Sequence, residues 1–264
     1  MKVFRRWFDL RQETPQLEST TNWVPRPFCN CLDGQYADNR CDPNRSARRV
    51  EWQERSLHTG VQDMGSRAWR ALTSYIEEVA SKGLTELNPR AGIGEEYWEQ
   101  IVTLPPSIGR LQSVKLLSVY GSHLVCIPPE IGDMTNLEEF VPYTSRSLHW
   151  FPYEITRCKK LVRSCVSTRC LYGNYKYRPP FPKLPQFAQT VMPSVCSVCG
   201  GPFSSYGSQQ AWISLRVATD VLPLLVHACS DVCIGRLPKP AEGYLQRRHR
   251  GGLDLEQPPL DHLP

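Results

Sequence analysis

The sequence contains no apolar run that approaches the roughly 18 residues needed to cross a membrane as a helix. Residues 1–10 include basic side chains, but no apolar stretch follows them, which excludes a conventional signal peptide. We therefore expect a cytoplasmic protein with no membrane partner. Long basic tracts are absent as well. A net charge of +5 over 264 residues does not favour a chain that wraps nucleic acid.

Motifs of several enzyme classes are also missing. The sequence has no G-x-x-x-x-G-K-[ST] phosphate loop, no G-x-G-x-x-G fingerprint opening a helix, and no G-x-S-x-G nucleophile elbow. Cys196 and Cys199 match the second half of a zinc deaminase signature, but the H-x-E half is absent upstream. The sequence therefore predicts a protein without catalytic activity.

Residues 65–83 have the residue pattern of a helix. Apolar side chains recur there at helical spacing, and charged residues fall on the other faces. The apolar positions are Trp69, Leu72, Ile76, Val79 and Ala80. Gly83 follows the last of them and suits the end of a helix. We predict one amphipathic helix here.

A repeat follows the helix. The segments LPPSIGRL (104–111) and IPPEIGDM (127–134) are offset by 23 residues, and FPYEITRC (151–158) follows 24 residues later. Between them, a second pattern of inward-facing positions recurs in the same register. These positions are Val114, Leu117, Val119, Ser122 and Leu124; Leu137, Phe140, Pro142, Ser145 and Leu148; and Leu161, Ser164, Val166, Arg169 and Leu171. Two sub-patterns held over three periods indicate a repeat architecture.

Over residues 98–175 this pattern resembles the Pro-containing leucine-rich repeat. The resemblance implies stacked coils, each with a short strand, that together form a small parallel sheet and a continuous core. Three departures make the second and third coils irregular. Ser or Arg stands where the family has Asn, Pro142 occupies a strand position that needs a donor, and Ser164 is polar at an inward position.

The repeat register also predicts which strand residues face solvent. They form three rows across the sheet: Leu116, Glu139 and Arg163; Ser118, Val141 and Cys165; Tyr120, Tyr143 and Ser167. Exposed aromatic and aliphatic residues mixed with single charges are typical of a protein-contact surface. We therefore predict another protein as the partner. The alternative is that the flanking chain covers this face.

Four cysteines near the C-terminus have the spacing of a metal site. Cys196 and Cys199 form a C-x2-C-G-G turn, and Cys229 and Cys233 are four residues apart at the start of a predicted helix. Four thiolates complete a closed tetrahedral shell, which predicts one structural Zn²⁺. The pattern resembles the treble-clef and zinc-ribbon group over residues 192–240. The alternatives are buried reduced thiols, or His227 as a ligand in place of Cys229.

The remaining cysteines are less informative, although 11 cysteines in a reducing compartment do not favour disulfides. A second zinc site is conceivable at Cys29, Cys31, Cys41 and His58, but the one-residue gap is unusual for chelation, and unrelated thiols are the alternative. The cysteines that fall in repeat positions are expected to pack in the core. They are Cys126, Cys158, Cys165 and Cys170.

The predicted fold class is α+β: a short leucine-rich-repeat solenoid with a helical N-terminal cap and a small zinc-stabilised C-terminal domain. The expected boundaries are 1–62 (irregular segment), 63–97 (helical cap), 98–175 (three coils), 176–191 (linker), 192–240 (zinc-binding domain) and 241–264 (tail). From about residue 65 onward the chain is similar to bacterial leucine-rich-repeat-domain proteins. The segments PEIG (129–132), WFPYEITR (150–157) and YGNYKYRPPFP (172–182) carry this similarity.

Two other functions remain open. The zinc module can bind nucleic acid through basic residues near the C-terminus and a stacking tyrosine. These residues are Arg236, Lys239, Tyr244, Arg247, Arg248, His249 and Arg250. The second alternative is a ubiquitin-ligase-like bacterial effector, because some of these join Pro-containing repeats to a cysteine-bearing catalytic domain. Here the C-terminal portion is short for such a domain.

Overall fold

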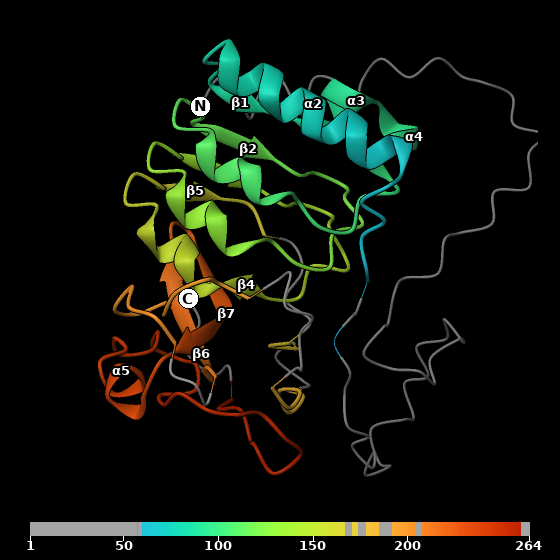
Figure 1. Cartoon of the computed structure of the whole chain (residues 1–264). Coiled ribbons are helices and arrows are strands. Elements are labelled where there is room, and N and C mark those ends of the chain that lie inside the picture. The colour runs from blue at the N-terminus through green and yellow to red at the C-terminus, as the bar shows by residue number, and fades with distance from the viewer. Residues whose placement is uncertain are drawn as a thin grey trace, which may run out of the picture.

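The computed structural model describes residues 57, 60–166, 171–173, 178–184, 192–203 and 207–259. Over these residues the chain combines a parallel sheet, a β-hairpin and short helices, consistent with the predicted α+β class. Figure 1 shows the order along the molecule. Helix α2 lies at one end, the parallel strands and their 3-10 helices follow, and the hairpin with helix α5 lies at the other end.

Helix α2 (Arg67–Ser81) confirms the helix predicted over residues 65–83. It begins where the Ser66 hydroxyl accepts a hydrogen bond from the Trp69 amide at 3.1 Å, and its apolar stripe is buried. It ends at Ser81, Lys82 is its C-cap, and Gly83 follows with a φ of +60°, the left-handed geometry that favours glycine. Three short elements follow before the first repeat. They are β1 (Glu86–Leu87), α3 (Pro89–Ile93) and α4 (Glu95–Trp98).

The repeats build a four-stranded parallel sheet in the order β1-β2-β3-β5. Its repeat strands are β2 (Leu116–Ser118), β3 (Glu139–Val141) and β5 (Arg163–Ser164). Leu116 pairs with Glu139, and Glu139 pairs with Arg163, so the 23- and 24-residue offsets predicted the strand register. Each repeat also contributes a 3-10 helix after its proline segment: η2 (Pro106–Arg110), η3 (Pro129–Asp133) and η4 (Tyr153–Arg157).

A pair of buried serines occupies the positions where the family has asparagine. The Ser122 hydroxyl donates to the Ser145 hydroxyl at 2.8 Å, and the Ser145 hydroxyl donates to the Val119 carbonyl at 2.7 Å. These bonds link two neighbouring repeats and satisfy a backbone acceptor in the interior. Between these two repeats, the two serine hydroxyls therefore supply hydrogen bonds at the positions where leucine-rich repeats have asparagine side chains.

The C-terminal part adds a second sheet, in the order β4-β7-β6. Strands β6 (Gln209–Val217) and β7 (Asp220–Ala228) form an antiparallel hairpin, and β4 (Phe151–Pro152) pairs with β7. Helix α5 (Asp231–Gly235) follows the hairpin. Because β4 belongs to the third repeat, this sheet joins the repeats to the hairpin.

The tip of the hairpin closes the exposed edge of the parallel sheet. The Ser164 hydroxyl donates to the Asp220 carboxylate at 2.7 Å, and the Thr219 hydroxyl donates to the Ser164 carbonyl at 2.7 Å. The Ser164 amide donates to the Thr219 hydroxyl at 3.1 Å. A polar residue therefore stands at this inward position because the next layer is a polar turn and not another repeat.

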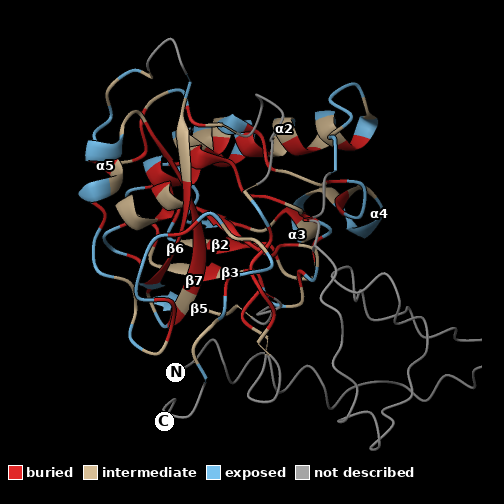
Figure 2. Ribbon diagram, turned by 90° about the horizontal axis from the view of Figure 1, so that it is seen from below, coloured by how far each residue is buried: buried red, intermediate tan, exposed pale blue. Residues whose placement is uncertain are grey.

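The core is continuous along the molecule. One cluster of buried side chains runs from Ala68 in α2 through the repeats to Leu237, and it includes Cys196 and Cys233. A second cluster gathers around Trp212 and includes Tyr172, Phe181 and Tyr244. Figure 2 shows buried positions along β2, β3, β6 and β7. The predicted boundary at 192 stays a prediction, but the segment after it shares its core with the repeats.

Residues 251–257 of the tail lie across the second cluster. Leu255 is buried, the Gly252 amide donates to the Phe181 carbonyl at 2.8 Å, and the Gln257 side chain donates to the Leu171 carbonyl at 2.7 Å. Gly251 has a φ of +73°, and a Cβ placed there would collide with the Pro182 carbonyl. The tail up to residue 259 therefore packs on the body.

Candidate metal centre and sheet surface

The first two cysteines lie on a tight turn. The Gly200 amide donates to the Cys196 carbonyl at 2.9 Å, and the Cys196 amide donates to the Gly201 carbonyl at 2.8 Å. Gly200 has a φ of +72°, which a glycine adopts without strain. The Gly201 amide points at the Cys199 sulfur, 3.4 Å away. The glycines of the C-x2-C-G-G pattern therefore shape the turn, as the sequence predicted.

The second pair of cysteines comes from the end of β7 and the start of α5. Ser230 is the N-cap of α5, and its hydroxyl accepts a hydrogen bond from the Cys233 amide at 3.3 Å. Two bonds hold this region to the turn. The Ser197 amide donates to the His227 carbonyl at 2.8 Å, and the His227 amide donates to the Ser197 hydroxyl at 3.1 Å. The hairpin thereby carries Cys229 and Cys233 to the turn.

The four sulfur atoms of Cys196, Cys199, Cys229 and Cys233 all lie within 4.8 Å of one another. The sulfurs of Cys199 and Cys229 are 3.7 Å apart, and those of Cys229 and Cys233 are 3.6 Å apart. These separations are too long for disulfides. They match the edge of a tetrahedral zinc–thiolate shell, which is about 3.8 Å for a metal–sulfur distance of about 2.3 Å. The four cysteines can therefore hold a metal ion.

The electrostatics of the cluster are those of a site that needs a cation. Burial on its own would raise the pKa of Cys196, but the surrounding backbone amides, including that of Cys229 at 3.3 Å, lower this pKa to about 6. Burial, together with the neighbouring thiols of Cys229 and Cys199, raises the pKa of Cys233 to about 12. Four thiolates this close repel one another unless a cation lies among them.

His227 is not part of the cluster, so the arrangement with His227 in place of Cys229 is wrong. Its imidazole is buried, and its Nδ1 atom lies 3.2 Å from the Ser208 hydroxyl. Burial lowers the pKa of His227 to about 4. The contribution of Ser197 to the site was not predicted, because its partner on β7 is 30 residues away in the sequence.

The predicted sheet-face residues lie as their register requires, with one correction. Ser118 is only 9% exposed, so it does not present a side chain to a partner. Ser167 lies outside the described residues. Half-buried positions are Leu116, Tyr120, Glu139, Val141 and Cys165, and Arg163 and Tyr143 are exposed. The face is therefore present, but it is narrower than the pattern predicted.

Three interactions order the side chains on this face. The rings of Tyr120 and Tyr143 are stacked, with centroids 6.0 Å apart and an angle of 17° between their planes. The Arg90 guanidinium lies 5.7 Å from the centroid of the Tyr120 ring. In the row of Leu116 and Glu139, Arg163 and Glu139 form an ion pair at 2.8 Å. Arg90 was not predicted, because it comes from α3, outside the repeat.

Other predicted residues fall into three groups. Cys29, Cys31, Cys41, His58 and Cys170 lie outside the described residues. Cys126 and Cys158 are buried in the interior, as expected for packing residues. Of the residues expected to contact nucleic acid, Tyr244 and His249 are buried, so the prediction that Tyr244 stacks on a base is wrong. Arg236, Lys239, Arg247, Arg248 and Arg250 are exposed.

Glu154 lies behind the cysteine turn, in η4. Its side chain is 1% exposed, and the Ser197 side chain, which lowers the pKa of this carboxyl, only partly offsets the effect of burial. Burial raises the pKa of this carboxyl, and the charge of Glu130, at the same position in the preceding repeat, raises it further. The folded state therefore disfavours the ionised form of Glu154.

Replacing Glu154 by glutamine is expected to raise the free energy of unfolding at pH 7, because glutamine removes the carboxylate charge that burial disfavours. Below the ordinary pKa of 4.5, both the folded and the unfolded carboxyl are protonated, so the gain should vanish there and appear as the pH rises. Thermal unfolding of both proteins from pH 4 to pH 8 measures this difference.

Glu138→Gln is the matched control. Glu138 accepts an ion-pair contact from Lys115 at 2.9 Å, and that contact lowers the pKa of the Glu138 carboxyl. Its replacement should therefore be neutral or slightly destabilising at pH 7. A Glu154→Gln protein that is less stable than wild type at pH 7 contradicts this explanation.

Comparison with known proteins gives a partial similarity to solved structures. No protein-family model matches the sequence, and no curated protein matches it. A solved leucine-rich-repeat protein of Leptospira interrogans is 32% identical over 26% of this chain. The match covers 17% of that protein, and its TM-score of 0.23 carries no argument about the fold. Among the residues that the structure describes, no helix combines the length and apolar composition needed to cross a bilayer.

Proposed function

We propose that this chain is a non-catalytic binding protein, in which three leucine-rich coils form a short solenoid whose sheet face contacts another protein. A structural Zn²⁺, held by Cys196, Cys199, Cys229 and Cys233, stabilises the C-terminal end. The observation that carries the proposal is the stacked pair Tyr120 and Tyr143, which lie just after the consecutive strands β2 and β3. Tyr143 is 37% exposed. Aromatic side chains on a rigid sheet offer contact area at a low entropic cost.

The closed set of four sulfurs supports a structural role for the metal. A catalytic zinc keeps an open position for water, whereas an all-thiolate shell leaves none. Outside the cluster, burial raises the pKa values of Cys126, Cys158 and Cys165, which disfavours the reactive thiolate form. These observations support a binding function over a ubiquitin-ligase-like reaction.

The double change Tyr120→Ala/Tyr143→Ala is expected to reduce partner binding at least about tenfold, because aromatic anchors dominate such contacts. The melting temperature should shift by only a few degrees, since Tyr143 is exposed and Tyr120 is half-buried. A photo-crosslinking residue placed at Val141 gives the readout. When the rest of the chain is native, this residue should form one discrete adduct with the partner protein. The adduct should be absent in the double variant.

The matched control places the same crosslinker at Val232, which is 63% exposed on α5 and away from the sheet face. No adduct of the same mass should form there. An adduct at Val141 that survives the loss of both tyrosines shows that the sheet face is not the binding site.

A second candidate is nucleic-acid binding by the C-terminal arginines. Arg247, Arg248 and Arg250 are exposed and line a hollow of about 320 Å³ together with Asp254. Binding of a fluorescent single-stranded oligonucleotide should then weaken steeply with salt and be lost when all three arginines are replaced by glutamate. Salt-independent binding, or none, removes this candidate.

A further inference from the structure

The outer edge of β6 is only partly covered. The Trp212 amide donates to the His249 carbonyl at 2.8 Å, and the His249 amide donates to the Trp212 carbonyl at 3.1 Å. The backbone groups of Trp212 therefore face away from β7. Because these groups alternate along a strand, those of Ser214 and Arg216 face the same way. The Ser214 carbonyl accepts from the Ala241 amide at 2.9 Å.

Beyond Ala241 this edge is open. The described residues offer no backbone partner to the Ser214 amide or to the amide and carbonyl of Arg216. Such an unpaired row of donors and acceptors is a template for an additional strand. The open stretch from Ser214 to Val217 is long enough for a short extended segment of about four or five residues.

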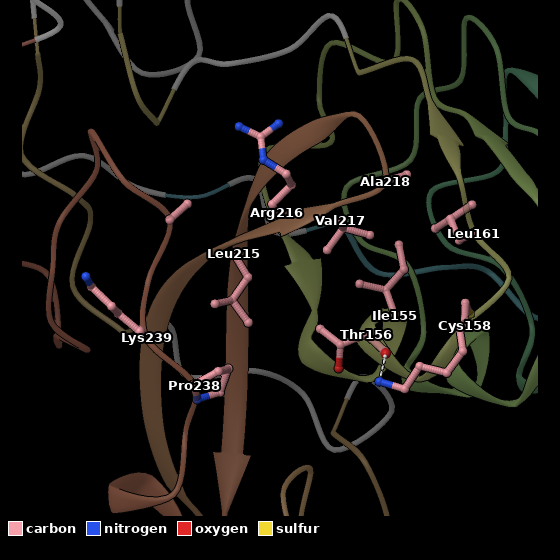
Figure 3. Close-up of a pocket in the computed structure, with 12 residues that line it drawn as sticks. Ile155, Thr156, Cys158, Leu161, Leu215, Arg216, Val217, Ala218, Pro238 and Lys239 are labelled. Carbon is pink, nitrogen blue, oxygen red and sulfur yellow. Dashed lines mark hydrogen bonds between the residues drawn. The ribbon is translucent and has the colours of Figure 1, made fainter. Parts of the chain in front are cut away.

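A groove of about 470 Å³ lies beside this edge, between β6 and η4. Its floor is apolar, formed by the side chains of Ile155, Leu161, Leu215 and Val217. Figure 3 shows Val217 pointing from β6 toward Ile155 across this space. A strand added to β6 would place every second side chain over that floor.

The charge around the groove has one sign. Lys159, Arg216 and Lys239 line it, and none of the lining residues is acidic. None of the three forms an ion pair with another described residue. The Lys159 ammonium donates only to the Thr156 carbonyl, at 2.8 Å, and Arg216 reaches the Thr219 carbonyl at 3.5 Å. An acidic ligand would therefore meet cations that have no competing carboxylate.

We propose that this β6 groove binds an extended segment of another protein by strand addition, with apolar and acidic residues alternating along that segment. The apolar side chains lie over Leu161, Leu215 and Val217, and the acidic ones lie on the opposite face of the added strand, beside Arg216. Lys159 and Lys239, at the groove, favour a segment of net negative charge. Backbone hydrogen bonds to Ser214 and Arg216 supply affinity, and the groove and the cations supply selectivity. This surface is separate from the sheet face that carries Tyr120 and Tyr143.

The first test uses fluorescent five-residue peptides and the full chain, with anisotropy as the readout. A peptide of alternating valine and glutamate should bind saturably. The same peptide methylated on the backbone amides that face β6 should bind at least about tenfold more weakly, because strand pairing is lost while the side chains are kept. A peptide of alternating valine and lysine should not bind. Equal binding of the methylated peptide, or no binding of the glutamate peptide, overturns the proposal.

Charge-reversal variants of the protein give the second test. Lys159→Glu/Lys239→Glu should weaken binding of the valine–glutamate peptide about tenfold or more. Lys160→Glu is the matched control, because Lys160 is an exposed neighbour that does not line the groove and bonds Asn136 instead. Both variants change exposed side chains, so both should fold. Unchanged affinity in the double variant, or an equal loss in the control, contradicts the acidic-ligand assignment.

Discussion

Replacing Phe151 by alanine is expected to lower the free energy of unfolding by about 3–5 kcal/mol, the range for large buried aromatic residues. Phe151 is fully buried, and its ring meets that of Phe140 edge-to-face at 5.9 Å. It also belongs to β4, where it pairs with Leu224 of β7. The alanine variant would therefore leave a cavity where the repeats join the hairpin.

Chemical denaturation followed by circular dichroism and by tryptophan fluorescence measures this effect. Because one core runs from Ala68 to Leu237, both probes should report a single transition at the same midpoint in wild type. Val162→Ala, a change at a 64% exposed position, is the control and should shift stability by less than about 0.5 kcal/mol. Two separate transitions in wild type, or a Phe151→Ala cost below about 1 kcal/mol, contradict a shared core.

Removing the metal is expected to lower the melting temperature by about 10 °C or more. Metal binding contributes directly to folding free energy when its ligands come together only in the fold. A loss of about 4 kcal/mol corresponds to this shift at about 2–4 °C per kcal/mol for a chain of this size. Two of the four clustered cysteines, Cys196 and Cys233, belong to the main core cluster, so the effect should reach beyond the hairpin.

Thermal unfolding with and without a zinc chelator measures this effect, and Cys199→Ser and Cys165→Ser are the matched variants. Cys199 belongs to the four-cysteine cluster and Cys165 does not, although neither is fully buried. Cys199→Ser should resemble the chelated protein, and a chelator should change it little further. Cys165→Ser should keep the wild-type response to the chelator. A wild-type melting temperature that the chelator does not change argues against a structural metal.

The parts of the structure that depend on local spacing could be predicted from the sequence. The apolar stripe of α2 and its terminating Gly83 are within one helix, and the pairing of Leu116 with Glu139 follows from the repeat offset. The four cysteines could be selected because each pair is close in the sequence, within one turn of chain or one turn of helix. Each of these features follows from the spacing of residues along the sequence.

The parts that depend on contacts between distant segments could not be predicted in this way. Ser164 breaks the apolar pattern of the repeat because it forms hydrogen bonds with Thr219 and Asp220, which come more than 50 residues later. The pairing of β4 with β7 has no sequence period, because β4 is a two-residue strand within a repeat. Ser118 is buried although its register places it in the outward row. Strand register determines which way a side chain points, but it does not determine whether other residues cover that side chain.

The most direct test of the account is elemental analysis of the protein purified without an affinity metal column, beside a Cys196→Ser/Cys229→Ser variant. The four clustered sulfurs predict about one zinc per chain in wild type and none in the variant, together with a loss of folding cooperativity. Absence of bound metal from the wild-type protein, with freely reactive thiols at Cys196 and Cys229, would contradict the structural metal site.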